Sequence, residues 1–239
     1  MRNEQSWVPS KLVFDKRRGR YVPHRKGVSL GSRLAVGAQA EPYERLLREH
    51  ARGRMLDCGC GKVPFYELYR KHISTLTCID WNDTGHSDLT VDLSGPLPFE
   101  PTSFDTVLLS DVLEHIARPE GLINEITRVL APSGALILTV PFLYHVHEAP
   151  HDYYRYTRFA LQKLCDDSGL EVRELSAYGG YPDVLLDLLN KGLAKVPPLC
   201  EIFLGAVDWT TRTRAYAYWR AASRERFPLG YCLVATKPG

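Results

Sequence analysis

The sequence has no long apolar run and little net charge. No stretch approaches the ~18 consecutive apolar residues that span a bilayer, and the N-terminus lacks the apolar segment of a signal peptide. The 30 basic and 28 acidic residues leave a formal charge of +2. We therefore expect no transmembrane segment and no broad attraction to nucleic acid, while peripheral contact with a membrane stays open.

Cysteine pairs of the usual functional spacing are also missing. None of the six cysteines stands in a C-x-x-C motif, which argues against a zinc ribbon or a dithiol redox site. Several lie in apolar, strand-like runs, where a free thiol behaves as a small hydrophobe. This usage predicts a reducing, cytoplasmic environment. The cysteines are Cys58, Cys60, Cys78, Cys165, Cys200 and Cys232.

Two common phosphate-binding motifs are absent, and a different glycine turn takes their place. The chain has neither G-x-G-x-x-G nor G-x-x-x-x-G-K-[ST]. A short apolar strand instead ends at Asp57, and Gly59 and Gly61 follow with Cys60 between them. Glycine lets the backbone turn sharply and approach a ligand closely. The acid before the turn suits a ligand with a cationic amine better than one with a pyrophosphate.

Strands alternate with helices along the middle of the chain. Repeated alternation of this kind favours an α/β fold with a doubly wound, mostly parallel sheet. The helix over 112–130, with a break at Pro119-Glu120, includes Glu114 and His115 near its start, and we assign these two side chains to capping and packing. We expect strands near 54–57, 76–80, 89–93, 104–109 and 135–140, and helices over 41–52, 65–72, 112–130 and 158–168.

The C-terminal third predicts a helical insertion. Strands are expected over 171–177 and 229–236, and a hairpin between them would need only a few residues. The chain instead has about fifty residues there, with helices expected over 184–196 and 202–224. We interpret this insertion, about 180–227, as a substrate lid. A homodimer face and a contact for a lipid-linked substrate are the alternatives.

The N-terminal segment is basic. Residues 1–27 contain eight Lys/Arg against two acids, and we expect 1–40 to form an irregular cap in front of a domain over 41–239. A solvated arm is one interpretation. A contact for an anionic substrate or partner is the other.

Five motifs occur in order along the chain. They are the glycine turn, Asp80, Val91-Asp92-Leu93, 97–116 with its Ser110-Asp111-Val112-Leu113-Glu114-His115, and 128–136. Together they resemble the motifs of class I S-adenosylmethionine-dependent methyltransferases, most closely the small-molecule group that includes ubiquinone-type enzymes. The similarity covers about 53–177 and implies a Rossmann-like, seven-stranded fold with S-adenosylmethionine as the cofactor. One departure is Val63, where the family often has a third glycine.

The resemblance also implies which residues bind the cofactor. Asp57 and the backbone of Gly59, Cys60 and Gly61 would hold the methionine end, and the carbonyl of Ser110 would face its amine.

The nucleoside would lie against the next two strand ends. Asp80, which comes 19 residues after Gly61, has the spacing of the acid that accepts hydrogen bonds from ribose hydroxyls. Trp81 could cover the adenine face. Asp92 would accept the adenine amino group, and the Leu93 amide would meet a ring nitrogen.

The segment 141–157, the histidine loop, is the most unusual part of the chain. It leaves a strand end where ligands bind in sheets of this kind. His145, His147 or His151 could act as a general base. Alternatively, His145 and His147 could bind a metal with His151 or Asp152. The loop could also be structural, with Asp152 or Thr157 capping the next helix. We expect substrate contacts from Tyr144, Tyr153, Tyr154 and Arg155.

The sequence therefore predicts a methyltransferase that acts on oxygen or nitrogen of a small molecule, such as a sugar or a natural-product intermediate. We expect no metal, and a base is not obligatory because positioning alone supplies much of the rate. An RNA or protein methyltransferase recruited by the basic segment is one alternative. A non-catalytic cofactor-binding or scaffold subunit is the other.

Overall fold

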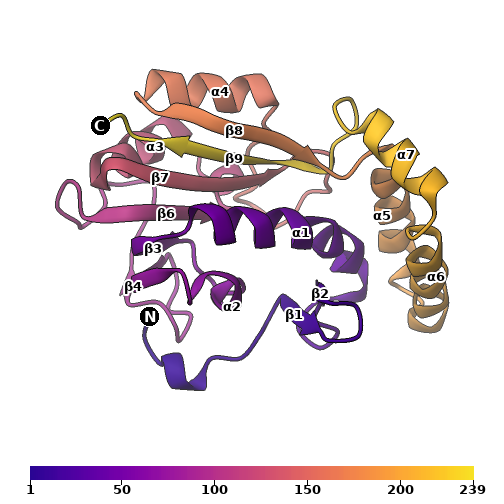
Figure 1. Cartoon of the computed structure of the whole chain (residues 1–239). Helices are drawn as coiled ribbons and strands as arrows, with labels where there is room; N and C mark the ends of the chain where they lie inside the picture. Colours follow the sequence, from indigo (N-terminus) through magenta and orange to yellow (C-terminus); the bar gives the residue numbers. More distant parts are fainter.

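The computed structural model describes residues 1–239, and a seven-stranded sheet forms its centre (Figure 1). The strand order is β5-β4-β3-β6-β7-β9-β8, with only β9 antiparallel to its neighbours. This confirms the expected doubly wound, mostly parallel sheet. The strands are β3 (Gly53–Cys58), β4 (Ile73–Asp80), β5 (Leu89–Thr90), β6 (Phe104–Ser110), β7 (Leu130–Pro141), β8 (Glu171–Tyr178) and β9 (Gly230–Thr236).

Two hydrophobic clusters lie on opposite faces of this sheet. Side chains of a strand alternate between faces, and the clusters follow that period. Leu136, Leu138 and Val140 of β7 belong to one cluster, whereas Ile137 belongs to the other. The apolar runs are therefore continuous because these strands are covered on both sides.

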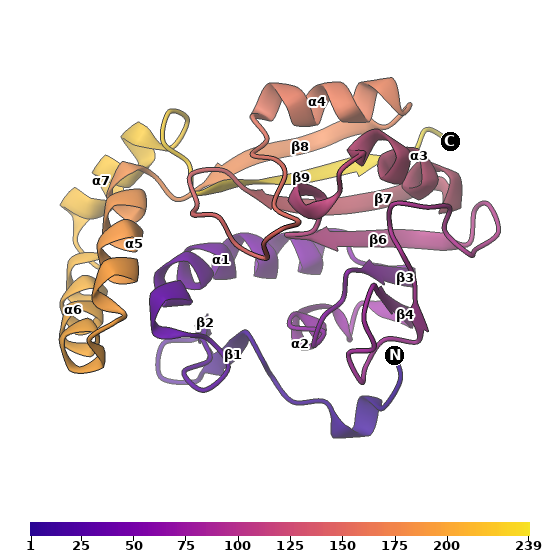
Figure 2. The same cartoon turned by 180° about the vertical axis from the view of Figure 1, so that it is seen from behind.

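Helices cover both faces (Figures 1 and 2). The helices α1 and α2 contribute to one cluster, and α3 and α4 contribute to the other. Their bounds are α1 (Arg33–His50), α2 (Tyr66–Tyr69), α3 (Pro119–Val129) and α4 (Arg158–Asp167).

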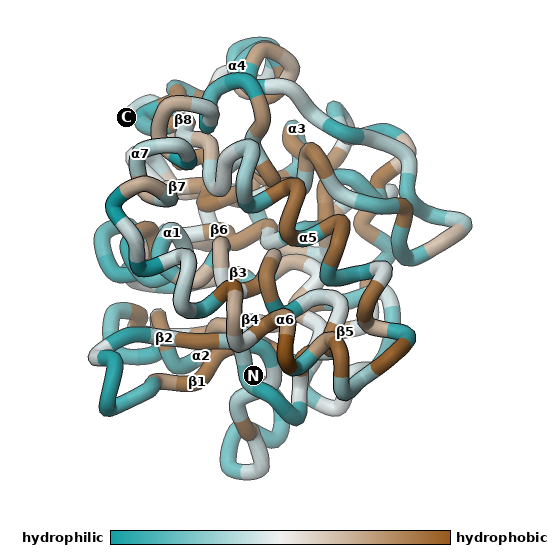
Figure 3. The backbone as a smooth tube through the Cα atoms, turned by 90° about the vertical axis from the view of Figure 1, so that its right-hand side faces the viewer, coloured by the Kyte–Doolittle hydropathy of each residue, from teal (hydrophilic) through white to brown (hydrophobic).

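The helical insertion leaves the carboxyl edge of the sheet. Tyr178 at the end of β8 pairs with Gly230, which also pairs with Pro141 at the end of β7. The inserted helices stand beside that edge (Figure 1), and the first two of them contain hydrophobic stretches (Figure 3). The expected insertion between the last two strands is thus confirmed. It consists of α5 (Tyr181–Leu193), α6 (Pro197–Thr210) and α7 (Arg214–Ser223).

The expectation of an irregular segment over 1–40 is wrong. A hairpin of β1 (Leu12–Asp15) and β2 (Arg20–Pro23) precedes α1, with short 3-10 turns at Glu4–Ser6 and Leu30–Ser32. Helix α1 begins at Arg33 rather than at Glu41, so Pro42 lies inside it. An interior proline costs about 3 kcal/mol, and the buried face of α1 offsets this by packing on the sheet.

Three expected helices are shorter than predicted. The region 112–118 contains only a 3-10 turn, η3 (Leu113–His115), before α3 begins at Pro119, and α2 covers only four residues. The helix expected over 202–224 is two helices, because the Thr213 side chain accepts a hydrogen bond from the Tyr216 amide and starts α7. Polar capping side chains mark such boundaries more strongly than the apolar pattern does.

All six cysteines are buried and unpaired, as small hydrophobic side chains would be. Among the helices, none combines the length and the hydropathy required to cross a bilayer.

Candidate functional site

The glycine turn after β3 requires glycine at its first position. Gly59 has φ of +69°, and a Cβ there would lie 2.5 Å from Val112 Cγ2. Its amide and that of Cys60 both donate to the Ile79 carbonyl, at 2.8 and 3.0 Å. Gly61 has φ of +50°, but a Cβ there would meet no atom within 4 Å. Steric crowding therefore restricts Gly59 and backbone conformation restricts Gly61.

Val63 follows in the same left-handed conformation, with φ of +48°. A β-branched residue rarely adopts it. The side chain is fully buried in the hydrophobic cluster, and the indole of Trp7 donates to the Val63 carbonyl at 3.0 Å. The turn therefore has the shape that a glycine would give, and the valine packs into the core.

Asp57 is a buried acid at the start of this turn. Its Oδ2 accepts a hydrogen bond from the Tyr69 hydroxyl at 2.9 Å. Burial raises the pKa of Asp57 to about 7, the Tyr69 hydrogen bond opposes this, and the charge of Asp80 adds to it. Near neutral pH this carboxyl therefore gains or loses a proton readily.

Asp80, at the end of β4, braces the turn. Its Oδ2 accepts from the Gly61 amide at 2.9 Å and its Oδ1 from the Asn82 amide at 3.0 Å. The neighbouring Trp81 is half exposed, and its ring lies edge-on to that of His151 at 5.2 Å between centroids. Two acids and an accessible aromatic ring thus flank the glycine turn.

The other predicted cofactor residues lie at adjacent strand ends. Asp92 accepts from the Ser94 amide at 2.9 Å, and Leu93 is buried in the core. Ser110 ends β6, and its hydroxyl is hydrogen-bonded to that of Tyr43. The structure therefore gathers these residues along one edge, around Asp57 and Asp80.

A cavity of about 270 Å³, the edge cavity, opens beside this edge. Residues from α1, the ends of β6 and β7, and the histidine loop line it. Its polar lining includes Gln39, Asp111, Glu114, His115 and His147. The Gln39 amide donates to Asp111 Oδ2 at 3.2 Å and to the Tyr178 hydroxyl at 2.9 Å. The edge cavity is small, part apolar and lined by convergent polar groups, as binding sites for small molecules are.

The histidine loop is fixed by its own ion pair. The Arg155 guanidinium contacts both carboxylate oxygens of Asp152, which also accepts from the His147 amide at 2.9 Å. The Arg155 side chain holds the pKa of Asp152 well below its usual range. Thr157 caps α4 by accepting from the Ala160 amide. The structural interpretation of the loop is therefore confirmed for Thr157, and Asp152 is bound within the loop.

The three loop histidines do not converge. His147 lines the edge cavity, His151 lies against Trp81, and the His145 ring is 6.1 Å from that of His147 between centroids. Burial, aided by the charge of Lys191, lowers the pKa of His145. The Glu114 carboxyl raises the pKa of His147.

The predicted substrate residues are held in different ways. The Tyr154 hydroxyl donates to the Ala117 carbonyl at 3.0 Å, and the Tyr153 hydroxyl lies 3.1 Å from His151 Nδ1. Tyr144 lines the edge cavity, and the Lys191 ammonium of α5 lies 4.2 Å from its ring centroid. The insertion thus contacts the histidine loop at the wall of the edge cavity.

Sequence reasoning missed several residues of this site. Lys11 and Gln39 come from the segment expected to be irregular, and Lys11 pairs with Asp111 at 3.1 Å. Glu114 and His115 line the edge cavity instead of starting a helix. Burial raises the pKa of Glu114. For Glu114 and His115 the sequence did hold a signal, because they come soon after a buried strand whose end lies at the ligand-binding edge.

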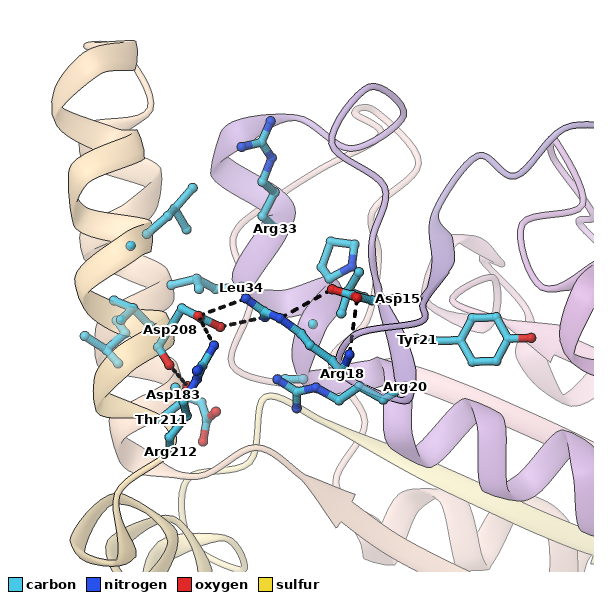
Figure 4. Close-up of a pocket in the computed structure, with 18 of the residues that line it drawn as sticks. Asp15, Arg18, Arg20, Tyr21, Arg33, Leu34, Asp183, Asp208, Thr211 and Arg212 are labelled. Atoms are coloured by element: carbon cyan, nitrogen blue, oxygen red, sulfur yellow. Dashed lines mark hydrogen bonds and ion pairs between the residues drawn. The ribbon is translucent and has the colours of Figure 1, made fainter.

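A second cavity of about 580 Å³ lies between the β1–β2 hairpin, α1 and the insertion (Figure 4). Its lining is dominated by ion pairs. Arg18 contacts Asp208 through two hydrogen bonds of 2.8 and 3.0 Å and also pairs with Asp15. Arg33 pairs with Glu201 at 2.7 Å. These pairs fasten the insertion to the N-terminal part of the chain.

Comparison with known proteins identifies the kind of domain that contains this site. Residues 56–138 match a family model described as a methyltransferase domain. No curated protein matches the sequence.

Solved structures of similar fold cover most of the chain. The [4+2]-cyclase SpnF is 20% identical with a TM-score of 0.55, and the match covers 92% of this chain and 86% of that one. An S-adenosylmethionine-dependent methyltransferase from Mesorhizobium loti is 14% identical with a TM-score of 0.55, covering 85% and 100%. A chain in the complex between the Haloferax volcanii Trm112 methyltransferase activator and the putative methyltransferase is 18% identical with a TM-score of 0.58, covering 87% and 94%.

The matched region includes the glycine turn, Asp80, the end of β6 and most of β7. Residues 56–138 therefore match a methyltransferase domain, in a chain whose fold is that of S-adenosylmethionine-dependent methyltransferases, and this match indicates S-adenosylmethionine as the cofactor.

Proposed function

We propose that the protein transfers the methyl group of S-adenosylmethionine to an oxygen or nitrogen atom of a small molecule, such as a sugar or a natural-product intermediate. The edge cavity is the observation that supports this most. At about 270 Å³ it is near the size range of small-molecule pockets. It lies beside the strand ends to which we assign the cofactor.

The residues at the edge fit this cofactor. The left-handed Gly59 and Gly61 let the backbone approach the methionine end closely, and Asp57 can accept from its ammonium group. Asp80 keeps free carboxylate lone pairs beyond its two amide contacts, which suits ribose hydroxyls. The exposed face of Trp81 suits adenine.

Bound S-adenosylmethionine supplies an electrophilic methyl group on a sulfonium sulfur with a good leaving group. The main task of the protein is then to hold the acceptor in line with that methyl group. His147 is the predicted catalytic histidine that lines the edge cavity, so we assign it to the acceptor side. We retain Tyr144 as an acceptor contact because it lines the same cavity.

We further propose that the insertion acts as a lid and that 1–40 acts as a cap. The contact between Lys191 and Tyr144 supports this arrangement because it joins the insertion to the wall of the edge cavity. The ion pairs of Arg18 and Arg33 join the insertion to the N-terminal segment. Exposed apolar side chains on α5 and α6, including Leu188 and Ile202, are also consistent with a homodimer or an apolar partner.

Cofactor binding should weaken as the pH falls through 7. In the free protein the pKa of Asp57 is about 7, and the ionised carboxylate binds the methionine ammonium far more strongly than the neutral acid does. Affinity should therefore fall several-fold, about eightfold, between pH 7.5 and pH 6. The titration is not extended above pH 7.5, because an α-amino group such as that of the methionine end loses its proton near pH 7.7. Calorimetric titration at several pH values measures this, and Asp57→Asn should give a flat profile. An equally steep profile in that variant would contradict the role of Asp57.

An acceptor screen tests the proposed reaction. The protein is incubated with S-adenosylmethionine bearing a labelled methyl carbon and with sets of small alcohols, sugars and amines, and release of S-adenosylhomocysteine is measured. The chemical shift of the labelled product then distinguishes O-methyl from N-methyl. We expect release with at least one hydroxyl or amine class. Release only with RNA or protein acceptors would overturn the proposal.

A further inference from the structure

Three metal-ligating side chains converge at the wall of the edge cavity. Glu114 and His115 belong to η3 after β6, and His147 comes from the histidine loop after β7. One ligand atom of each lies within 4.8 Å of the other two. Glu114 Oε1 is 3.7 Å from the Nε2 atoms of both histidines. Strand topology thus joins two segments that are about thirty residues apart in sequence.

Glu114 is a buried carboxylate without a hydrogen-bond partner. Its side chain is 0% exposed, and neither oxygen accepts a hydrogen bond within the protein. The two histidine nitrogens at 3.7 Å are beyond hydrogen-bond distance. A buried carboxylate that accepts no hydrogen bond is costly to keep ionised, and a cation between Glu114 and the histidines would offset that cost.

Both histidines are oriented to offer a lone pair to that cation. His115 Nδ1 lies 2.8 Å from the His151 carbonyl oxygen, so Nδ1 donates its proton and Nε2 is left as the acceptor. His147 Nδ1 lies 3.3 Å from the His145 carbonyl and 3.4 Å from Asp152 Oδ2. Metal-ligating histidines are usually held in this way by a carbonyl or carboxylate on the other ring nitrogen.

The loop itself is fixed above Glu114. The amides of Tyr153 and Tyr154 donate to the Glu114 backbone carbonyl at 2.9 and 3.3 Å, and the Arg155–Asp152 pair holds the His147 segment. Ligands of one Zn²⁺ at about 2.0–2.1 Å from the metal stand roughly 3.4 Å apart in a tetrahedron. Contraction by a few tenths of an ångström would bring Glu114 to that distance from each histidine.

We propose that Glu114, His115 and His147 bind one divalent transition-metal ion, such as Zn²⁺ or Mn²⁺. Two imidazoles and one carboxylate suit these ions, whereas Mg²⁺ and Ca²⁺ prefer oxygen ligands throughout. Three protein ligands leave a coordination position open. Because the three residues line the edge cavity, that position faces the proposed acceptor.

The role of the ion rests on the proposed function. A hydroxyl of the acceptor bound at the open position would have a lowered pKa and lose its proton to solvent. The acceptor oxygen then forms a bond to the methyl carbon as the carbon–sulfur bond breaks, and the sulfur keeps that electron pair as a thioether. The assignment predicts an oxygen acceptor.

Metal binding by the full chain tests this site without any acceptor. Protein treated with a chelator is titrated with Zn²⁺, Mn²⁺ and Mg²⁺ by calorimetry, and thermal unfolding is followed with and without each ion. We expect one Zn²⁺ or Mn²⁺ per chain, a raised Tm, and weaker binding of Mg²⁺. Glu114→Gln and His147→Gln should each weaken binding by about 100-fold or more.

Matched controls keep the test interpretable. His145→Gln alters the same loop outside the cluster and should bind the ion as the unaltered protein does. Metal-free Glu114→Gln should stay folded and unfold close to the metal-free protein, because the Glu114 side-chain oxygens make no hydrogen bond that the substitution would break. Absence of stoichiometric binding, or binding unchanged in both ligand variants, would overturn the site.

Failure of the site and failure of the proposed function have different signatures. If the ion binds and the ligand variants lose it, but no small acceptor releases S-adenosylhomocysteine, the site stands and the proposed function fails. If small-molecule methylation proceeds equally after chelation and no ion binds, the function stands and the metal site is refuted.

Discussion

Replacing Gly59 with alanine should destabilise the protein and abolish measurable cofactor binding. The new Cβ would lie 2.5 Å from Val112 Cγ2 while the backbone stays at φ of +69°. The left-handed conformation costs about 1 kcal/mol and overpacking a further ~1–3 kcal/mol. We expect the free energy of unfolding to fall by about 3 kcal/mol and Tm by roughly 6–12 °C.

Gly61→Ala is the matched control for the steric part of this effect. Its φ is +50°, but a Cβ there meets nothing within 4 Å, so only the conformational cost of about 1 kcal/mol should appear. Denaturant unfolding of both variants measures the difference. Equal losses of stability would show that contact with Val112 does not restrict Gly59.

Asp80→Ala should lower the affinity for S-adenosylmethionine by at least about 100-fold. The variant removes the carboxylate assigned to the ribose hydroxyls, and each hydrogen bond to a charged group is worth ~1.5–3 kcal/mol. It also removes the acceptor of the hydrogen bonds that the Gly61 and Asn82 amides donate. Calorimetry with S-adenosylmethionine and S-adenosylhomocysteine should show the same loss, since the ribose is common to both.

Asp80→Asn separates the charge from the shape of the turn. The amide oxygen can still accept one of the two backbone hydrogen bonds, so we expect a smaller loss of affinity, about tenfold. Circular dichroism at the titration temperature shows whether each variant is folded. Full affinity in a folded Asp80→Ala variant would remove Asp80 from the cofactor site.

The sheet was predictable from sequence because local pattern and tertiary structure agree there. Runs such as Phe104–Leu109 and Ala135–Val140 are mostly apolar, and the structure covers both of their faces. Spacing alone also placed Asp80 at a strand end near the glycine turn, and the structure shows its carboxylate accepting a hydrogen bond from the Gly61 amide.

The first forty residues were not predictable because tertiary packing overrides local signals. Pro42 indicated a helix start, yet the chain is already helical from Arg33. The buried face of that helix, with Val36, Tyr43 and Leu46, offsets the cost of the proline. Local propensity is only a weak indicator when such packing is available.

The grouping of Glu114, His115 and His147 was equally hidden. It depends on the path of the histidine loop, which the Asp152–Arg155 pair and the Glu114 carbonyl determine. Sequence spacing instead suggested that His145 and His147 act together, and their rings are 6.1 Å apart between centroids. Contacts between a loop and a distant turn leave no periodic pattern in the sequence.

The most direct test of the central proposal is where the protein places a labelled methyl group. A cell extract is incubated with the protein and S-adenosylmethionine labelled in its methyl group. Ultrafiltration then separates small molecules from RNA and protein, with Asp80→Ala as the control. We predict label in the small-molecule fraction that is absent with Asp80→Ala. Label confined to RNA or protein, or no transfer above the variant, would contradict the proposal.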